Sequence, residues 1–165
     1  DGSQMMPDFI LPPGYHLRGY LPGDESSWIE VIKTGEFGAV WDRTRFDRYI
    51  TQPERKDGSR LVVRDGKVVA ATFASVHNES ENLGRLDEVV ALPDYRGLGL
   101  GRAVCTEVVK YLVGRGYSRV MLFTDDWRLP AIGLYLSMGF EPQMTREDMA
   151  DRWDSIRAKR KAASR

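Results

Sequence analysis

The N-terminal third of the chain alternates apolar runs with polar turns that contain proline and glycine. This pattern predicts short strands and amphipathic helices. Asp24 and Asp42 each precede a helical pattern, and an aspartate at that position caps the first free amides of a helix. The expected elements are a strand over residues 15–20, helices over 24–33 and 42–50, and a polar loop over 52–58.

The middle of the chain predicts a meander of antiparallel strands. Strands are expected over residues 60–64 and 67–76. Asp65-Gly66 lies between them, and this dipeptide supplies the positive φ angles of a tight hairpin turn. A third apolar segment, residues 86–92, predicts a strand that ends at Pro93.

The second half predicts a strand–helix–strand–helix order. Leu100 and Val104 share one side of a helix expected over residues 99–113. The other expected elements are a strand over 118–125, a helix over 130–138, a last strand starting at Phe140, and a C-terminal helix with a Thr145/Asp148 capping box. Antiparallel hairpins followed by a crossover unit predict an α/β fold, with an α+β mixed sheet of antiparallel early strands and one parallel pair.

Length and charge narrow the function classes. A chain of 165 residues fits one domain, which we assign to residues 6–165, with residues 1–5 as an addition from expression. Lys plus Arg (24) equals Asp plus Glu (24), which argues against a nucleic-acid partner. No apolar run approaches the ~20 residues that span a bilayer, so we expect a cytoplasmic protein without a membrane partner.

Cysteine and histidine are too few for a metal centre. Cys105 is the single cysteine, and His16 and His77 have no partner in the sequence. Cys105 lies beside the apolar stripe of the 99–113 helix and is expected to be a buried structural thiol rather than a nucleophile. We therefore expect no metal cofactor.

The segment Leu86 to Gly101, LDEVVALPDYRGLGLG, carries the most specific chemistry. A strand stops at a proline, and a glycine-rich loop leads into a helix. Glycines let the main chain approach a ligand closely, and the first amides of a helix have no intrahelical partner. Together they predict a pyrophosphate site, to which Arg96 and Arg102 would add charged contacts. The alternative is that the glycines only make a turn.

Two other nucleotide-binding loops fit less well. A P-loop ends in Gly-Lys-Ser/Thr, whereas Gly101 is followed by Arg102 and Ala103. A dinucleotide fingerprint places its first glycine directly after the strand, but here residues 93–96 intervene. The chain beyond Asp126 is also too short for the second half of a dinucleotide fold.

Two motifs resemble the GNAT superfamily of acyl-CoA-dependent N-acetyltransferases. RGLGLG, residues 96–101, matches its Arg/Gln-x-x-Gly-x-Gly/Ala signature after a strand with a proline-containing loop. AIGLY, residues 131–135, followed by Gly139-Phe140, matches its second signature. The resemblance covers residues 86–142 and implies the GNAT-type fold, in which the parallel strands would separate after Ala91 to admit the cofactor.

The resemblance also implies which residues bind acetyl-CoA, the expected cosubstrate. Val89, Val90 and Ala91 would pair with the pantetheine arm as an added strand. Arg128 stands where many relatives have a cofactor-contacting asparagine, and it would bind a CoA phosphate or face water. The residues expected at the pyrophosphate are Arg96, Gly97, Leu98, Gly99, Leu100, Gly101 and Arg102.

The resemblance and the chemistry together name candidate catalytic residues. Tyr135 matches the tyrosine that donates a proton to the CoA thiolate in many relatives; the alternative is a core position. An amine must lose a proton before it attacks, and a carboxylate can accept that proton. Asp87 and Glu88 are candidate bases. In relatives with a base on this strand, it usually lies two or four positions before the residue that matches Val89, so the resemblance favours Asp87, and strand alternation places Glu88 on the other face. Asp125 and Asp126, at the end of the neighbouring strand, are further candidates.

The resemblance thus predicts an acyltransferase that moves an acetyl group from acetyl-CoA to a primary amine by direct attack in a ternary complex. The acceptor, a small-molecule or a peptide amine, stays open, and so does a homodimer. One alternative is a noncatalytic acyl-CoA-binding or regulatory module, which Arg128 in place of asparagine leaves open. The other is a dinucleotide-binding protein.

Overall fold

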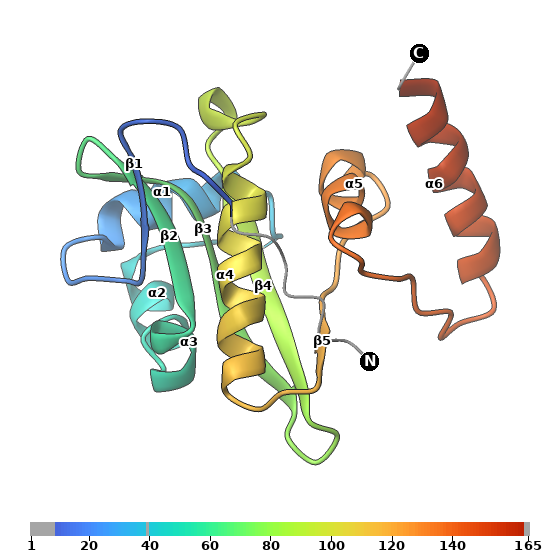
Figure 1. Ribbon diagram of the computed structural model, residues 1–165, viewed down its shortest axis with the longest axis horizontal. Coiled ribbons are helices and arrows are strands. Elements are labelled where there is room, and N and C mark those ends of the chain that lie inside the picture. Colours follow the sequence, from blue (N-terminus) through green and yellow to red (C-terminus); the bar gives the residue numbers. More distant parts are fainter. Residues whose placement is uncertain (1–8, 39, 164–165) are drawn as a thin grey trace. The chain divides into compact units, whose positions relative to one another are not determined.

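The computed structural model describes residues 9–38 and 40–163 (Figure 1). It consists of two compact units, Asp1–Leu122 and Phe123–Arg165. Residues 1–5, expected to be an addition from expression, lie outside the described residues. No helix within the described ranges combines the length and the apolar character needed to cross a membrane.

The first unit is built on a five-stranded sheet in the order β1-β2-β3-β4-β5. Neighbours from β1 to β4 are antiparallel, and β4 and β5 are parallel, which confirms the predicted mixed sheet. The β2–β3 turn is the predicted Asp65-Gly66 hairpin, with positive φ at both residues. The strands are β1 (Tyr15–Arg18), β2 (Ser59–Arg64), β3 (Lys67–Asn78), β4 (Leu83–Ala91) and β5 (Arg119–Met121).

Helices cover both faces of this sheet (Figure 1). On one face, Trp28 and Phe46 from two N-terminal helices pack with Phe73 of β3. On the other face, Leu100 and Val104 of the longest helix of this unit pack against the sheet. Both clusters include the C-terminal end of β4, where the candidate site lies, through Val90 in the first and Ala91 in the second. The helices are α1 (Glu25–Lys33), α2 (Arg43–Tyr49), α3 (Pro53–Asp57) and α4 (Leu100–Gly114).

The starts of the N-terminal helices differ in part from expectation. Asp42 caps α2 as predicted, because its side chain accepts a hydrogen bond from the Arg45 amide (2.7 Å). Asp24 precedes α1 without capping it, and its carboxylate instead forms a bidentate pair with Arg18. The expected polar loop over 52–58 holds α3, which starts at Pro53 because proline is tolerated in the first helical turn.

The second unit holds α5 (Leu129–Ser137) and α6 (Met149–Ala163). The strand expected to start at Phe140 is wrong, because the Phe140 amide donates to the Tyr135 carbonyl (3.1 Å). That bond belongs to the C-terminal turn of α5, which Gly139 closes at φ 90°, so the amide is not available to a strand. The strand expected over 118–125 is also shorter, since β5 ends at Met121.

The C-terminal helix is confirmed, but its expected capping box is wrong. α6 begins at Met149, directly after Asp148, so Asp148 lies before the helix and not in its first turn. The Thr145 hydroxyl lies 3.6 Å from the Met149 sulfur instead of capping a helix amide. Within this unit, Gly133 of α5 lets the Arg160 side chain of α6 approach closely, at 3.3 Å from where a Cβ would be.

Candidate functional site

The glycine-rich loop turns the chain from β4 into α4. A short 3-10 turn, Pro93–Tyr95, is followed by Gly97 and Gly99, each at φ 78°, which only glycine adopts without strain. The first bond of α4 runs from the Ala103 amide to the Gly99 carbonyl (3.1 Å). No hydrogen bond between described residues uses the amides of Gly97 to Gly101 as donors. These amides lie at the positive end of the helix dipole and therefore form a ready site for an anion.

Beside this loop, β4 has an edge without a partner strand. β4 and β5 pair at only three positions, from Leu83↔Arg119 to Arg85↔Met121. The strands therefore separate after Arg85, and the expectation that they separate after Ala91 is wrong, because β5 ends at Met121. From Leu86 to Ala91, β4 pairs with β3 on one side, and no described strand pairs with the other side. An extended ligand has an open ladder of main-chain groups there.

A bulge interrupts β4 directly after Asp87. Phe73 pairs with Asp87, and Ala71 pairs with Val90, so Glu88 and the next residue together stand opposite a single β3 residue. Glu88 has φ 49°, and it is the one described non-glycine residue with positive φ that lies inside a strand. Such a conformation costs on the order of 1–3 kcal/mol and is often found at functional sites. Nothing in the sequence signals this angle, because it depends on the register of β3 and β4.

Asp87 is buried and already engaged. It is 5% exposed, its carboxylate accepts a hydrogen bond from the Ser75 hydroxyl, and it lies 2.6 Å from the Arg85 guanidinium. Asp87 pairs with Phe73 across the strands, and Phe73 and Val90 belong to one apolar cluster. Asp87 and Val90 therefore share a face although they are three residues apart, so the regular alternation used to place Asp87 and Glu88 on opposite faces relative to Val89 does not hold through the bulge.

The arginines and the cysteine near the loop differ in environment. Arg96 is exposed, and its Nε donates to the Ala91 carbonyl (3.2 Å), which ties the loop to the end of β4. Arg102 is half-buried in the first turn of α4. Cys105, one turn further, is fully buried, and this burial raises the pKa of its thiol to about 12. The structure thus confirms the expected buried cysteine.

The remaining candidates lie in the second unit. Tyr135 of α5 is 8% exposed and packs edge-on against Phe140, with ring centroids 6.1 Å apart. Arg128 directly precedes α5, donates to the Asp125 carboxylate (2.9 Å) and stacks over Trp127. Asp126 forms a bidentate pair with Arg152 of α6 (2.7 and 2.8 Å), and the hydrogen bonds from this arginine lower the pKa of Asp126. Asp125 and Asp126 are thus both engaged with arginines.

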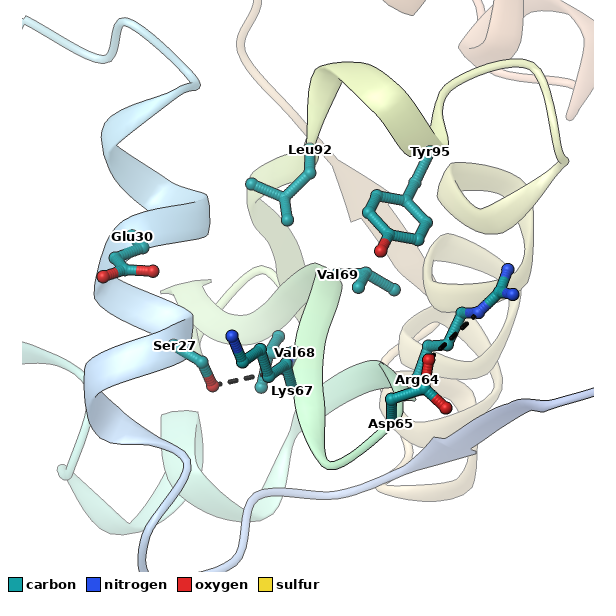
Figure 2. A pocket seen from close by; sticks show the side chains of 9 residues that line it. All are labelled: Ser27, Glu30, Arg64, Asp65, Lys67, Val68, Val69, Leu92 and Tyr95. Atoms are coloured by element: carbon teal, nitrogen blue, oxygen red, sulfur yellow. Dashed lines mark hydrogen bonds and ion pairs between the residues drawn. The ribbon is translucent and has the colours of Figure 1, made fainter.

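The structure also contains a pocket of about 280 Å³ that the sequence did not predict (Figure 2). Ser27 and Glu30 of α1 line one side, and Arg64 and Lys67 of the β2–β3 hairpin line another. Tyr95 completes the lining from the start of the glycine-rich loop. None of the residues predicted to bind cofactor or to act in catalysis lines this pocket. Within the described ranges, no group of His, Cys, Asp or Glu side chains is arranged to hold a metal ion.

Comparison with known proteins gives a consistent family assignment. The model of the Acetyltransferase (GNAT) family matches residues 28–140. Mycothiol acetyltransferase of Streptomyces coelicolor is 31% identical over 141 residues, which cover 82% of this chain and 45% of the relative. The chain therefore spans about half the length of the curated relatives it matches.

Solved structures show the same fold. A GCN5-related N-acetyltransferase from Sphaerobacter thermophilus superposes with a TM-score of 0.71 and 26% identity, covering 86% of this chain and 45% of that one. An aminoglycoside N-acetyltransferase in complex with CoA gives a TM-score of 0.67 with 17% identity, over 81% and 93% of the two chains. At that identity the second likeness shows the fold alone.

Proposed function

This chain belongs to the acetyltransferase (GNAT) family, and from that membership we propose that it transfers an acetyl group from acetyl-CoA to a primary amine. The observation that carries the proposal is the row of amides from Gly97 to Gly101, which no hydrogen bond between described residues uses, at the start of α4. These amides lie beside the open edge of β4. A diphosphate and an extended amide chain, the two parts of CoA next to its thioester, match these two features.

In this proposal, each part of acetyl-CoA has its own protein partners. The amides of the glycine-rich loop bind the pyrophosphate, and Arg96, Arg102 and Arg128 add charge to the phosphates. The residues of the open β4 edge, Val89 to Ala91, pair with the pantetheine arm. An aminoglycoside N-acetyltransferase of the same fold was solved with CoA, which supports CoA over the dinucleotide alternative. The reaction needs no metal, because the thioester is already activated.

Glu88 is the better candidate for the general base. Both Asp87 and Glu88 lie on β4, and the Asp87 carboxylate accepts from Ser75 and pairs with Arg85. We assign Asp87 to positioning: it holds Arg85 and the β3–β4 pairing next to the bulge. The strained main chain at Glu88 sets the direction of its side chain independently of the strand alternation. The acetyl oxygen would be stabilised in the transition state by a β4 amide near Val89 or Val90.

The transfer is a single displacement through a tetrahedral intermediate. The ammonium form of the amine gives one proton to Glu88, and the neutral nitrogen attacks the thioester carbonyl to form the C–N bond. The C–S bond then breaks, and the second N–H proton passes to water. Tyr135 donates a proton to the leaving CoA thiolate; this role rests on its place in the AIGLY motif. The products are the N-acetylated amine and CoA, and both side chains recover their charge states by proton exchange with water.

We propose a small molecule as the acceptor. The curated relatives are mycothiol acetyltransferases, and one structural neighbour is an aminoglycoside N-acetyltransferase. Structural neighbours include ribosomal-protein-alanine N-acetyltransferases as well, so the proposal rests on the mycothiol acetyltransferases, which are the more similar relatives at about 30% identity.

For the cellular location we propose the cytoplasm. The single cysteine, Cys105, is a buried and protonated thiol, which is compatible with a reducing compartment.

A thiol-release assay tests this function directly. Acetyl-CoA is incubated with the protein and a panel of amino sugars, simple alkylamines, amino acids and short peptides, and released CoA thiol is measured. We expect release that depends on the amine and is strongest with small-molecule amines. Binding of acetyl-CoA without release by any amine would contradict the enzymatic proposal and leave the noncatalytic binding module.

A further inference from the structure

The start of the described chain lies on the glycine-rich loop. A Cβ placed on Gly99 would overlap the tip of the Phe9 ring and lie 2.7 and 3.1 Å from two further ring carbons. Figure 1 shows the blue beginning of the chain beside the N-terminal end of α4. Gly99 therefore has two reasons to be glycine: its φ of 78° and the close approach of this ring.

The segment that carries Phe9 is anchored to the same end of the fold. Leu11 packs on the apolar cluster that contains Leu100 and Val104 of α4. The Tyr15 amide donates to the Pro12 carbonyl (3.2 Å), which joins the segment to the start of β1. Phe9 and Leu11 are partly buried, whereas Ile10 between them is 89% exposed. Residues 9–12, here termed the N-terminal strap, thus lie against the loop by alternate side chains.

We propose that the N-terminal strap competes with the diphosphate of CoA for the glycine-rich loop and so acts as an autoinhibitory contact. This inference rests on the proposed function. A diphosphate bound by the Gly97 to Gly101 amides must approach Gly99 closely, and the Phe9 ring lies against Gly99 where a Cβ would stand. An apolar ring beside Gly99 offers the loop amides no acceptor comparable with a phosphate oxygen, so it does not replace the anion.

The strap lowers the affinity for CoA without abolishing it. With the strap in place the site is not competent, so the apparent dissociation constant is the intrinsic value divided by the fraction of molecules in which the strap is open. One ring and one leucine side chain hold the strap, and this small contact is displaced by a tight ligand. Removing the ring should therefore tighten CoA binding by a moderate factor.

The test is a calorimetric titration of CoA into the full chain and two alanine variants. Phe9→Ala removes the ring from the loop, and Ile10→Ala is the matched control, because Ile10 is its exposed neighbour. We expect the Kd for CoA to fall about three- to tenfold in Phe9→Ala and to stay unchanged in Ile10→Ala. Hydrogen exchange of the wild-type strap amides should also become faster when CoA is bound.

The other possible results contradict either the strap alone or the strap together with the proposed function. Unchanged or weaker CoA binding by Phe9→Ala, with CoA bound by the wild type, overturns the strap and leaves the proposed function intact. Strap amides that exchange more slowly in the CoA complex also overturn it, because the strap would then be part of the binding site. If neither the wild type nor either variant binds CoA, the proposed function fails together with the strap.

Discussion

Asp87 and Glu88 are neighbours in β4, but their surroundings suit different tasks. Asp87 is buried between Ser75 and Arg85, whereas Glu88 lies at a bulge with positive φ. Two adjacent carboxylates with different environments can divide positioning and proton transfer between them. The distinction comes from the pairing of β3 with β4, which brings Ser75 to the Asp87 carboxylate.

Glu88→Gln should lower kcat about 10²-fold, because the amide cannot accept the proton of the attacking amine. The Kd for acetyl-CoA should change little, since the proposed contacts to the cofactor do not include the Glu88 side chain. Steady-state kinetics at saturating acetyl-CoA, together with calorimetry, measures both quantities. Glu79→Gln, the same exchange at an exposed position, is the control. A Glu88→Gln enzyme with wild-type kcat would remove this residue from the mechanism.

Cys105 should be unreactive in the folded protein. Burial raises the pKa of its thiol to about 12, so the thiolate that attacks a disulfide reagent is scarce at pH 8. We expect an aromatic disulfide reagent to label the native chain at less than a tenth of the rate seen in denaturant, roughly following the thiolate fraction and access. Stoichiometric labelling of native protein within minutes would contradict the buried position.

At the residue scale, the positive φ angles of the loop glycines could be predicted from the sequence, and the positive φ angle of Glu88 could not. Gly97 and Gly99 stand in a local pattern whose positive φ angles depend on residue type. The φ of Glu88 depends on a register shift between two strands, which no local pattern encodes. For the same reason, counting positions back from Val89, as the family resemblance suggests, favoured Asp87 as the base without allowing for the bulge.

The element scale is best illustrated by the start of α1. Asp24 is 7% exposed, forms a bidentate pair with Arg18 (2.6 and 2.8 Å) and accepts from the Leu21 amide (2.8 Å). Burial alone would raise the pKa of Asp24, but the bonds from Arg18 and Leu21 outweigh it and lower that pKa. This carboxylate connects the end of β1 to the turn before α1.

Asp24→Asn should lower the free energy of unfolding by about 1–3 kcal/mol, because it leaves Arg18 beside a neutral group. Asp47→Asn, which breaks the exposed i,i+4 pair with Arg43, should cost less than about 0.5 kcal/mol. Chemical denaturation at neutral pH measures both variants. If the two variants lost the same free energy of unfolding, the buried pair of Asp24 with Arg18 would be no more stabilising than an exposed pair.

The same pair predicts a pH dependence. The pKa of Asp24 in the folded state lies below its ordinary value of 3.8, so its stabilising effect is present above about pH 4. The effect is lost as the pH falls through the folded-state value. The difference in stability between wild type and Asp24→Asn should therefore shrink between pH 7 and about pH 2. If the stability difference between wild type and Asp24→Asn grew as the pH fell, the lowered pKa of Asp24 would be contradicted.

The hydrophobic pattern predicts the order of the helices and strands. The wrong predictions concern segments where the local sequence pattern differs from what tertiary contacts stabilise. α3 was expected as loop because its residues are polar, and a polar helix shows no apolar stripe. Phe140 follows an apolar helix and looks like a strand start, but its amide closes the C-terminal turn of α5. β5 ends before the expected residue although the apolar run continues through Phe123, because strand length depends on the neighbouring strand as well as on the run itself.

At the scale of the whole molecule, the family match covers residues 28–140, and α6 lies beyond it. The mixed sheet could be predicted from the order of antiparallel hairpins and a later crossover unit, and the glycine-rich turn into α4 from the residues of 96–101. The acceptor could not, because acceptor walls are made by side chains from several elements and carry no fixed spacing. The N-terminal strap was also invisible, since Phe9 meets Gly99 only in the folded chain.

The central claim is that the loop amides at the start of α4 bind the diphosphate of CoA. Gly101→Glu places a negative charge among these amides, and Gly114→Glu makes the same change in the open space at the other end of α4. Titration calorimetry with acetyl-CoA should show binding by the wild type and by Gly114→Glu. For Gly101→Glu, the affinity should fall by about 10²-fold or more, which corresponds to about 2.7 kcal/mol or more. Equal affinity in all three proteins would contradict the account.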